Sequence, residues 1–210
     1  MSREDAERLL IYDATPPRGD AWLRRSWATG ARLYRSLGRV DAFHGASSWA
    51  DAFEWLARRP AGPIREVQYW GHGRWGRVMI GGDVLSEESL RAGHPHFEAL
   101  GALRERWLPD AGSLIWFRTC ETFGADRGKS FAERLTDTLG VRAAGHTYVI
   151  GVLQSGLHGL GPGVTPSWPS EEGLKHGTGA EPSQAWMSTA SAPNTIHFMN
   201  GAIPAEWFER

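Results

Sequence analysis

Apolar segments of strand length alternate with amphipathic segments of helix length, and this alternation constrains the fold more than any other feature. Five segments have the composition of buried strands: 9–14, 39–43, 64–70, 113–119 and 141–151. Most are separated by stretches in which apolar residues recur at helical spacing. Strands joined by helices form parallel sheets that the helices cover. The sequence therefore predicts an α/β fold, with a mostly parallel central sheet and helices on both faces.

Local patterns place the ends of several elements. Ser48 with Asp51, and Ser130 with Glu133, have the spacing of a capping box at a helix start. A further helix is expected over 97–107, and Gly140 is expected to end the helix that follows the second capping box. The segment GRVMIG with the Gly81–Gly82 turn predicts a small hairpin.

A chain of 210 residues can bury one substantial core, so a single domain over 1–210 is expected. Its core would span about 8–152, and 153–210 would form a loop-rich extension with a final short strand at TIHFM. Gly, Pro, Ser and Thr dominate 151–194 without any period, which predicts long loops. We interpret the glycines of GLGPG, 159–163, as a flexible flap.

Charge and composition exclude several classes of partner. The formal net charge is −1, so there is no basic field for nucleic acid or an anionic membrane. The N-terminus lacks the apolar run of a signal peptide, and no segment is long and apolar enough to span a bilayer, so a soluble cytoplasmic protein is expected. The single cysteine, Cys120, excludes an intramolecular disulfide and leaves either a buried inert thiol or a nucleophile. No metal site is expected.

His72 and Cys120 each follow a predicted strand. In an open parallel sheet, functional groups gather beyond the carboxyl ends of the strands, so both residues should lie at one edge. Gly71 and Gly73 flank His72 and let the backbone turn sharply, which presents the imidazole. The turn after Cys120 leads to a helix start, whose partial positive charge would favour a thiolate.

Three segments, VQYWGHGRWGRVMIGG, SLIWFRTCETFGADRGKSFAERLTDTLG and RAAGHTYVIG, resemble the caspase, gingipain, legumain and separase superfamily, in particular its bacterial caspase-like branches. The resemblance covers roughly residues 8–152. It implies a caspase-like three-layer fold with Cys120 as nucleophile, His72 as acid and base, and the backbone amides of Gly73 and Cys120 as the oxyanion donors. It implies no metal or organic cofactor. Thr119 and Glu121 depart from the alanine and arginine that flank the cysteine in many caspases, so caspase substrate rules are not carried over.

Candidate substrate contacts come from the same comparison. Arg118 shares its side of the strand with Cys120, and Arg18 follows the first strand; together they would suit an acidic side chain of the substrate. Arg118 could instead pair with Asp13 or Glu121. Two tryptophans of the late loops, Trp168 and Trp186, would either shape a peptide cleft or anchor those loops.

The sequence thus predicts a cysteine endopeptidase that acts on a peptide or protein through an acyl-enzyme, with a regulatory protein as a conceivable further partner. Two alternatives remain open: a catalytically silent binding or scaffold protein of the same fold, and an amidase or acyl transferase that uses the same two residues. The sequence contains neither a Gly-x-Ser-x-Gly elbow nor a His-Glu-x-x-His motif, which argues against a serine hydrolase or a zinc peptidase.

Overall fold

The structure is a computed structural model that describes residues 6–15, 21–60 and 62–208. Within these residues six strands form the central sheet, in the order β10-β8-β7-β3-β1-β2. Their bounds are β1 (Glu7–Asp13), β2 (Ala42–Ala46), β3 (Ile64–Trp70), β7 (Leu114–Arg118), β8 (Arg142–His146) and β10 (Leu157–Leu160). All neighbours pair in parallel except β10, which is antiparallel to β8. The predicted α/β fold with a mostly parallel sheet is therefore confirmed.

The apolar composition of the strands follows from burial on two faces. Along β7, Ile115 and Phe117 point to one face, while Leu114 and Trp116 point to the other. All residues of this strand are buried. A strand covered on both sides reads as a continuous apolar run, which is why the sequence marked it so clearly.

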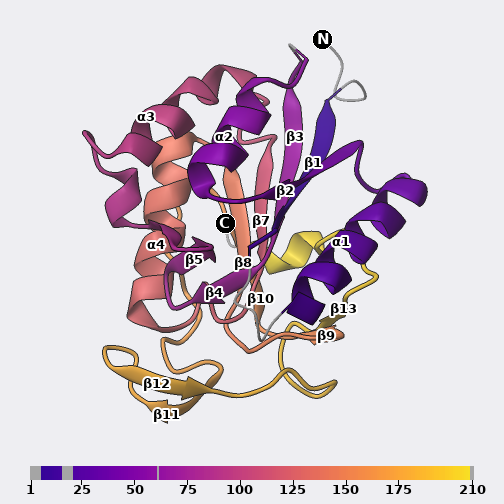
Figure 1. Cartoon of the computed structure of the whole chain (residues 1–210). Helices are drawn as coiled ribbons and strands as arrows, with labels where there is room; N and C mark the ends of the chain where they lie inside the picture. Colours follow the sequence, from indigo (N-terminus) through magenta and orange to yellow (C-terminus); the bar gives the residue numbers. More distant parts are fainter. Residues whose placement is uncertain (1–5, 16–20, 61, 209–210) are drawn as a thin grey trace.

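Helices cover both faces of the sheet, as predicted, but unequally (Figure 1). One face packs against α2 (Trp49–Ala57), α3 (Pro95–Ala102) and α4 (Ala125–Leu139). The other face packs against α1 (Ala21–Ser36) over β1 and β3. Over β7 and β8 that second face is covered by the C-terminal segment, residues 196–208, which contains β13 (Ile196–His197) and the 3₁₀ turn η5 (Ala205–Trp207).

The first of the two predicted capping boxes is present in part, because the Asp51 carboxylate accepts a hydrogen bond from the Ser47 amide at 2.8 Å instead of the Ser48 amide. The Ser48 hydroxyl accepts a hydrogen bond from the Asp51 amide at 3.0 Å and caps α2. The second is wrong, because α4 begins at Ala125 and places Ser130 inside the helix, where its hydroxyl donates to Glu87. Gly140 ends α4 in the left-handed conformation, with φ 67°, as predicted.

The predicted helix over 97–107 is shorter and begins earlier. Pro95 stands in the first turn of α3, where its missing N–H costs nothing, and His94 precedes it as the cap. The helix ends at Ala102 and is followed by the 3₁₀ turn η4 (Arg104–Arg106). His96 of this helix is hydrogen-bonded to Asp83 at 2.7 Å.

The predicted hairpin is confirmed and has a third strand. β4 (His72–Arg74), β5 (Arg77–Ile80) and β6 (Asp83–Ser86) form an antiparallel sheet, and the 3₁₀ turn η3 (Glu88–Leu90) follows. Trp75 and Gly76 connect β4 to β5 with φ values of 39° and 77°. Positive φ at both central residues is the signature of the type I′ turn, whose twist suits a tight hairpin.

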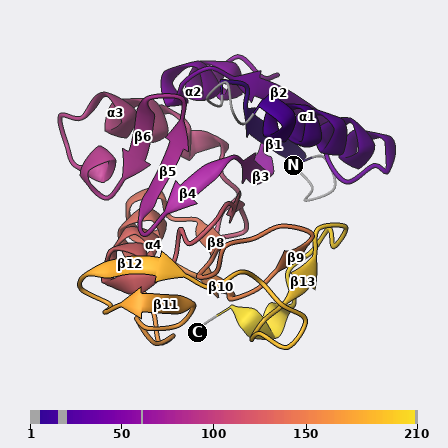
Figure 2. The same cartoon turned by 60° about the horizontal axis from the view of Figure 1, so that its bottom comes forward.

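The late part of the chain is more ordered than predicted. Residues 151–194 contain β9 (Leu153–Gln154), β10, and a hairpin of β11 (Leu174–Gly177) and β12 (Pro182–Ala185), which lies beside α4 in Figure 2. The flexible flap at 159–163 is also wrong at its start, because Gly159 lies in buried β10. A Cβ on Gly159 would lie 2.5 Å from Phe208 Cε1, so this glycine permits close packing.

No helix in the described part of the chain has the length and apolar character needed to cross a membrane.

Candidate active site

His72 and Cys120 lie at one edge of the central sheet, as the sequence predicts. β3 and β7 are adjacent and parallel, and their last paired residues are Trp70 and Arg118. The chain runs two residues beyond each of these to reach His72 and Cys120. Both candidates therefore follow the carboxyl ends of neighbouring parallel strands, where such sheets place functional groups.

Backbone hydrogen bonds join the two loops that carry these residues. The amide of Trp75 donates to the carbonyl of Glu121, and the amide of Gly76 donates to the carbonyl of Thr122, both at 2.9 Å. A Cβ added to Gly73 would lie 2.8 Å from the Cys120 carbonyl oxygen. The β4–β5 hairpin is thus fixed against the turn that contains Cys120.

The Cys120 thiol is partly buried and contacts the backbone after β8. Its sulfur accepts a hydrogen bond from the Ile150 amide at 3.4 Å and lies 3.9 Å from the Ile150 carbonyl. Burial raises the pKa of the Cys120 thiol, the Ile150 amide opposes this, and the Glu121 carboxylate raises it further. In the free protein the side chain is therefore a thiol at neutral pH, in contrast to the thiolate that the nearby helix start was expected to favour.

His72 is partly buried, and its ring packs edge-to-face on Trp27 of α1 with the ring centroids 5.4 Å apart. Its Nε2 atom is buried and has no hydrogen-bond partner among the described residues. His72 and Cys120 are thus not hydrogen-bonded to each other within the described chain. A buried polar atom without a partner is costly, and a catalytic role is one of the reasons for which such an atom is retained.

Glu121, next to the thiol, has an unusual backbone conformation. Its φ is 56°, in the left-handed region that residues with a side chain rarely adopt. Its amide donates to the Tyr148 carbonyl at 3.0 Å, and burial raises the pKa of its carboxyl while Arg74 opposes that rise. Non-glycine residues in this conformation persist where surrounding contacts hold them, and they cluster at functional sites.

The amide of Gly73 has an orientation suited to a ligand. Arg74 and Arg77 flank the two-residue turn and form a hydrogen-bonded pair, so Gly73 and Val78 form the next, non-hydrogen-bonded pair. In agreement, the Val78 carbonyl accepts a hydrogen bond from the Trp49 indole at 2.9 Å. The Gly73 N–H consequently points away from β5.

Arg118 lies in the interior, on the side of the sheet covered by α1 and the C-terminal segment. Its Nε and Nη2 donate to Gln154 Oε1 at 3.0 and 2.8 Å, and Nη2 also donates to the Phe198 carbonyl at 2.7 Å. Nη1 donates to the Tyr34 hydroxyl. The hydrogen-bond partners of Arg118 are thus neutral oxygen atoms and not the carboxylates of Asp13 or Glu121. This geometry gives no support to a contact between Arg118 and an acidic substrate.

The remaining predicted substrate contacts differ in position. Asp13 is buried at the carboxyl end of β1, where it accepts hydrogen bonds from the amide and hydroxyl of Thr15 at 2.7 and 2.9 Å. Trp168 is also buried, and its indole donates to the Phe123 carbonyl at 3.0 Å, so it anchors its loop. Trp186, in contrast, is 52% exposed. Arg18 lies outside the described residues.

Two contacts of the site were missed from the sequence, namely the Ile150 backbone at the thiol and Trp27 at the imidazole. The surface beside Ile150 is apolar, because the side chains of Val152 and Met187 are about three-fifths exposed. Val149 forms backbone hydrogen bonds with the segment that includes Trp186 and Met187. Ile150 follows the carboxyl end of a parallel strand, the same positional signal that pointed to Cys120. Applied to every strand, that rule would have identified this segment as well.

Comparison with known proteins adds no relative. No protein-family model matches the chain, and no curated protein shows significant similarity to it. Among the described residues, His, Cys, Asp and Glu form no group of three or more that could hold a metal ion.

Proposed function

We propose that the chain is a caspase-like cysteine endopeptidase, in which Cys120 attacks a peptide carbonyl and His72 transfers the protons. The observation that supports this most is the adjacency of β3 and β7, whose carboxyl ends lead directly into His72 and Cys120. The hydrogen bonds between the Trp75–Gly76 turn and the Cys120 turn add to it, because they keep the two loops in one geometry.

In the proposed reaction the Cys120 sulfur forms a bond to the carbonyl carbon, and His72 accepts the thiol proton. His72 then donates a proton to the leaving amine as the C–N bond breaks, which yields a thioester and the free amine. Water attacks the thioester, and the carboxylate product departs as the thiol is regenerated. The Gly73 amide, directed away from β5, and the Cys120 amide would stabilise the oxyanion.

The catalytically silent alternative has specific support. The raised pKa of the Cys120 thiol leaves little thiolate at neutral pH, and His72 makes no hydrogen bond to it within the described chain. For a peptidase of this geometry, substrate binding has to bring thiol and imidazole together, as active sites often do only in the complex. For a binding protein, the pair would stay apart.

A peptidyl acyloxymethyl ketone library distinguishes the two functions. Because Cys120 is the only cysteine, intact-mass measurement reports modification at one site. We expect one adduct in the unaltered protein and none in Cys120→Ala, with His72→Ala strongly slowing the reaction. His176→Ala, which alters an exposed histidine of β11, is the matched control and should react normally.

Cleavage of a peptide library gives the complementary result. We expect hydrolysis that Cys120→Ala abolishes, with circular dichroism showing that the variant stays folded. Hydrolysis that persists in Cys120→Ala would refute the nucleophile. Complete inertness toward electrophiles and peptides between pH 6 and 9 would instead support the binding protein, and turnover of non-peptide amides alone would support an amidase.

A further inference from the structure

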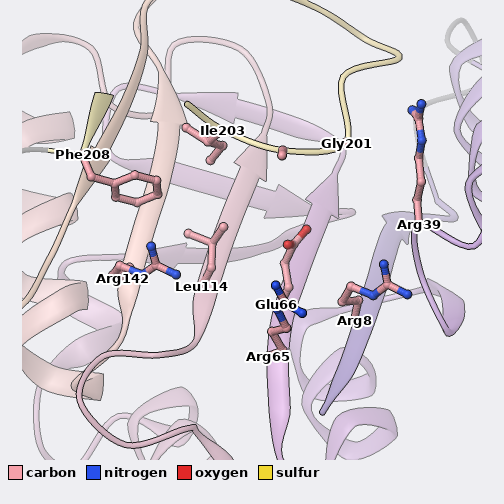
Figure 3. A pocket seen from close by; sticks show the side chains of 10 residues that line it. Arg8, Arg39, Arg65, Glu66, Leu114, Arg142, Gly201, Ile203 and Phe208 are labelled. Atoms are coloured by element: carbon pink, nitrogen blue, oxygen red, sulfur yellow. The ribbon is translucent and has the colours of Figure 1, made fainter. Parts of the chain in front are cut away.

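A pocket rich in arginine lies at the edge of the sheet opposite to His72 and Cys120. Its volume is about 290 Å³, near the lower end of the range for small-molecule sites. It opens where the parallel strands begin, and the C-terminal segment forms one wall (Figure 3). The lining residues are Arg8, Arg39, Arg65, Glu66, Leu114, Arg142, Gly201, Ala202, Ile203 and Phe208.

Four separate elements contribute the arginines. Arg8, Arg65 and Arg142 stand at or near the starts of β1, β3 and β8, and Arg39 comes from the loop before β2. Glu66 is the only acidic residue among the described residues of the lining, and Figure 3 shows it between Arg8 and Arg142. Four guanidinium groups around one carboxyl leave an excess of positive charge, which attracts an anion.

The contacts of Arg8, Arg39 and Arg65 with the described residues use only a few of their donors. Arg8 pairs with Asp41 at 3.2 Å, and Arg39 donates to the Met199 carbonyl. Arg142 donates from Nε to the Ala111 carbonyl at 3.1 Å. Arg65 is exposed and has no hydrogen bond or ion pair to any described residue. Each guanidinium carries five N–H donors in a planar fork, a geometry that matches phosphate oxygens.

Glu66 compensates only part of the positive charge of the pocket. Gln68 donates a hydrogen bond to its carboxyl at 2.6 Å, and burial raises the carboxyl pKa, although Arg8, Arg118 and Arg65 oppose that rise. Even with Glu66 and Asp41 both ionised, the arginines outnumber the carboxylates. The anion would therefore bind toward Arg8, Arg39 and Arg65 rather than directly over Glu66.

The other end of the pocket is apolar. Leu114, Ile203 and Phe208 line it, and Figure 3 places them on the side away from Arg8 and Arg39. The Phe208 ring is held in place by Arg142, whose guanidinium carbon lies 4.9 Å from the ring centroid. A ligand that fills the pocket thus combines an anionic group with an apolar or planar one.

We propose that this pocket binds a phosphate monoester of an apolar or planar organic group, with the phosphate on Arg8, Arg39 and Arg65 and the organic group against Leu114, Ile203 and Phe208. β3 (Ile64–Trp70) runs between the two edges, and its residues rise about 3.3 Å each, so Arg65 lies roughly 20 Å from His72. It is therefore a second site, separate from the proposed peptidase centre.

Calorimetric titration of the whole chain tests the proposal without any measurement of activity. The probes are adenosine 5′-monophosphate, inorganic phosphate and adenosine. We expect the monophosphate to bind more tightly than either fragment. Arg65→Ala and Arg39→Ala should each weaken its binding about tenfold or more, because each removes a charge-assisted contact. Arg24→Ala, which alters an exposed arginine of α1 outside the pocket, should leave the affinity unchanged.

Glu66→Gln supplies a change in the opposite direction. It removes the negative charge of Glu66 while keeping the shape of the side chain, so binding of the monophosphate should tighten severalfold. Three results would overturn the proposal: no binding of any probe at millimolar concentration, binding that Arg65→Ala and Arg39→Ala do not weaken, or weaker binding to Glu66→Gln. Equal affinity for phosphate and the monophosphate would overturn the assignment of the apolar end.

Discussion

Replacement of Arg118 by methionine removes a buried cation whose hydrogen bonds link three parts of the chain. The guanidinium donates to Gln154 before β10, to the Phe198 carbonyl in the C-terminal segment, and to Tyr34 of α1. It also lies against aromatic rings, with its central carbon 4.5 Å from the Trp116 ring centroid. Methionine supplies an apolar side chain of similar length, so the change in stability reports the loss of the guanidinium donors.

The expected cost follows from the acceptors that are left behind. Gln154 Oε1 loses both of its guanidinium hydrogen bonds in a region that excludes water, whereas the Phe198 carbonyl keeps the hydrogen bond from the Tyr34 hydroxyl. A buried acceptor left without a partner costs about 1–3 kcal/mol, so the free energy of unfolding should fall by about 2 kcal/mol. For a domain of this size, that corresponds to a melting temperature lower by roughly 5 °C.

Urea unfolding followed by tryptophan fluorescence measures this change, with Arg24→Met as a control that should alter the free energy of unfolding by less than about 0.5 kcal/mol. Arg118→Lys keeps the charge but not the planar fork, and should recover only part of the loss. The structural role would be refuted if Arg118→Met changed the free energy of unfolding by less than about 1 kcal/mol and lost only its turnover of acidic peptides. That result would restore Arg118 as a substrate contact.

Three further predictions concern the candidate site and its surroundings. Glu121→Gln should lower the pKa of the Cys120 thiol, because the carboxylate raises it, and the pH profile of alkylation by iodoacetamide should shift to lower pH. Gly73→Ala should slow the same alkylation, because the new Cβ would lie 2.8 Å from the Cys120 carbonyl and displace the turn, whereas Gly82→Ala meets no atom within 4 Å and should have no effect. Burial lowers the pKa of His146 to about 3. The free energy of unfolding should therefore fall by roughly 1.4 kcal/mol for each pH unit as the pH is lowered from 6.5 toward that value. His146→Gln should remove this slope from urea titrations.

The sign for His146 follows from proton uptake. Between pH 6.5 and about 3 the unfolded chain binds a proton at this residue and the folded chain does not, so stability falls as the pH falls. An unchanged acid slope in His146→Gln would count against its burial as a neutral side chain. For the thiol, an alkylation profile that Glu121→Gln leaves in place would show that the carboxylate points elsewhere. Equal effects of Gly73→Ala and Gly82→Ala would remove the steric argument.

The sequence predicted the central sheet well because its strands are marked by burial. β3 lies over the predicted residues, 64–70, and β7 lies within 113–119. All residues of β7 are buried and four of its five are apolar, and the last four residues of β3 are buried as well. β10 escaped prediction because its four residues, LHGL, contain the glycine that Phe208 packs against. The residues around Gly159 give no indication that the ring of Phe208, 49 residues later in the chain, packs against it.

The candidate site divides in the same way. The edge that carries His72 and Cys120 follows from topology, which alternating strands and helices largely determine. The surroundings of individual side chains do not, because their partners come from distant segments. Arg118 is bonded by Tyr34 and Phe198, 84 and 80 residues away, so its interior position cannot be deduced from its place in a strand. The prediction that Ser130 caps a helix was wrong for a related reason, since tertiary packing places the cap of α4 at Gly124, six residues earlier.

The C-terminal segment gives the molecule an order of assembly. Because the carbonyl of Phe198 holds Arg118, and Arg118 lies two residues before Cys120, the edge that carries the thiol is complete only after residues 196–208 have been synthesised and docked over β7 and β8. A nascent chain that ends before this segment would leave Leu114 and Trp116 uncovered. If the thiol is catalytic, the protein should therefore acquire activity only after residues 196–208 have left the ribosome and docked.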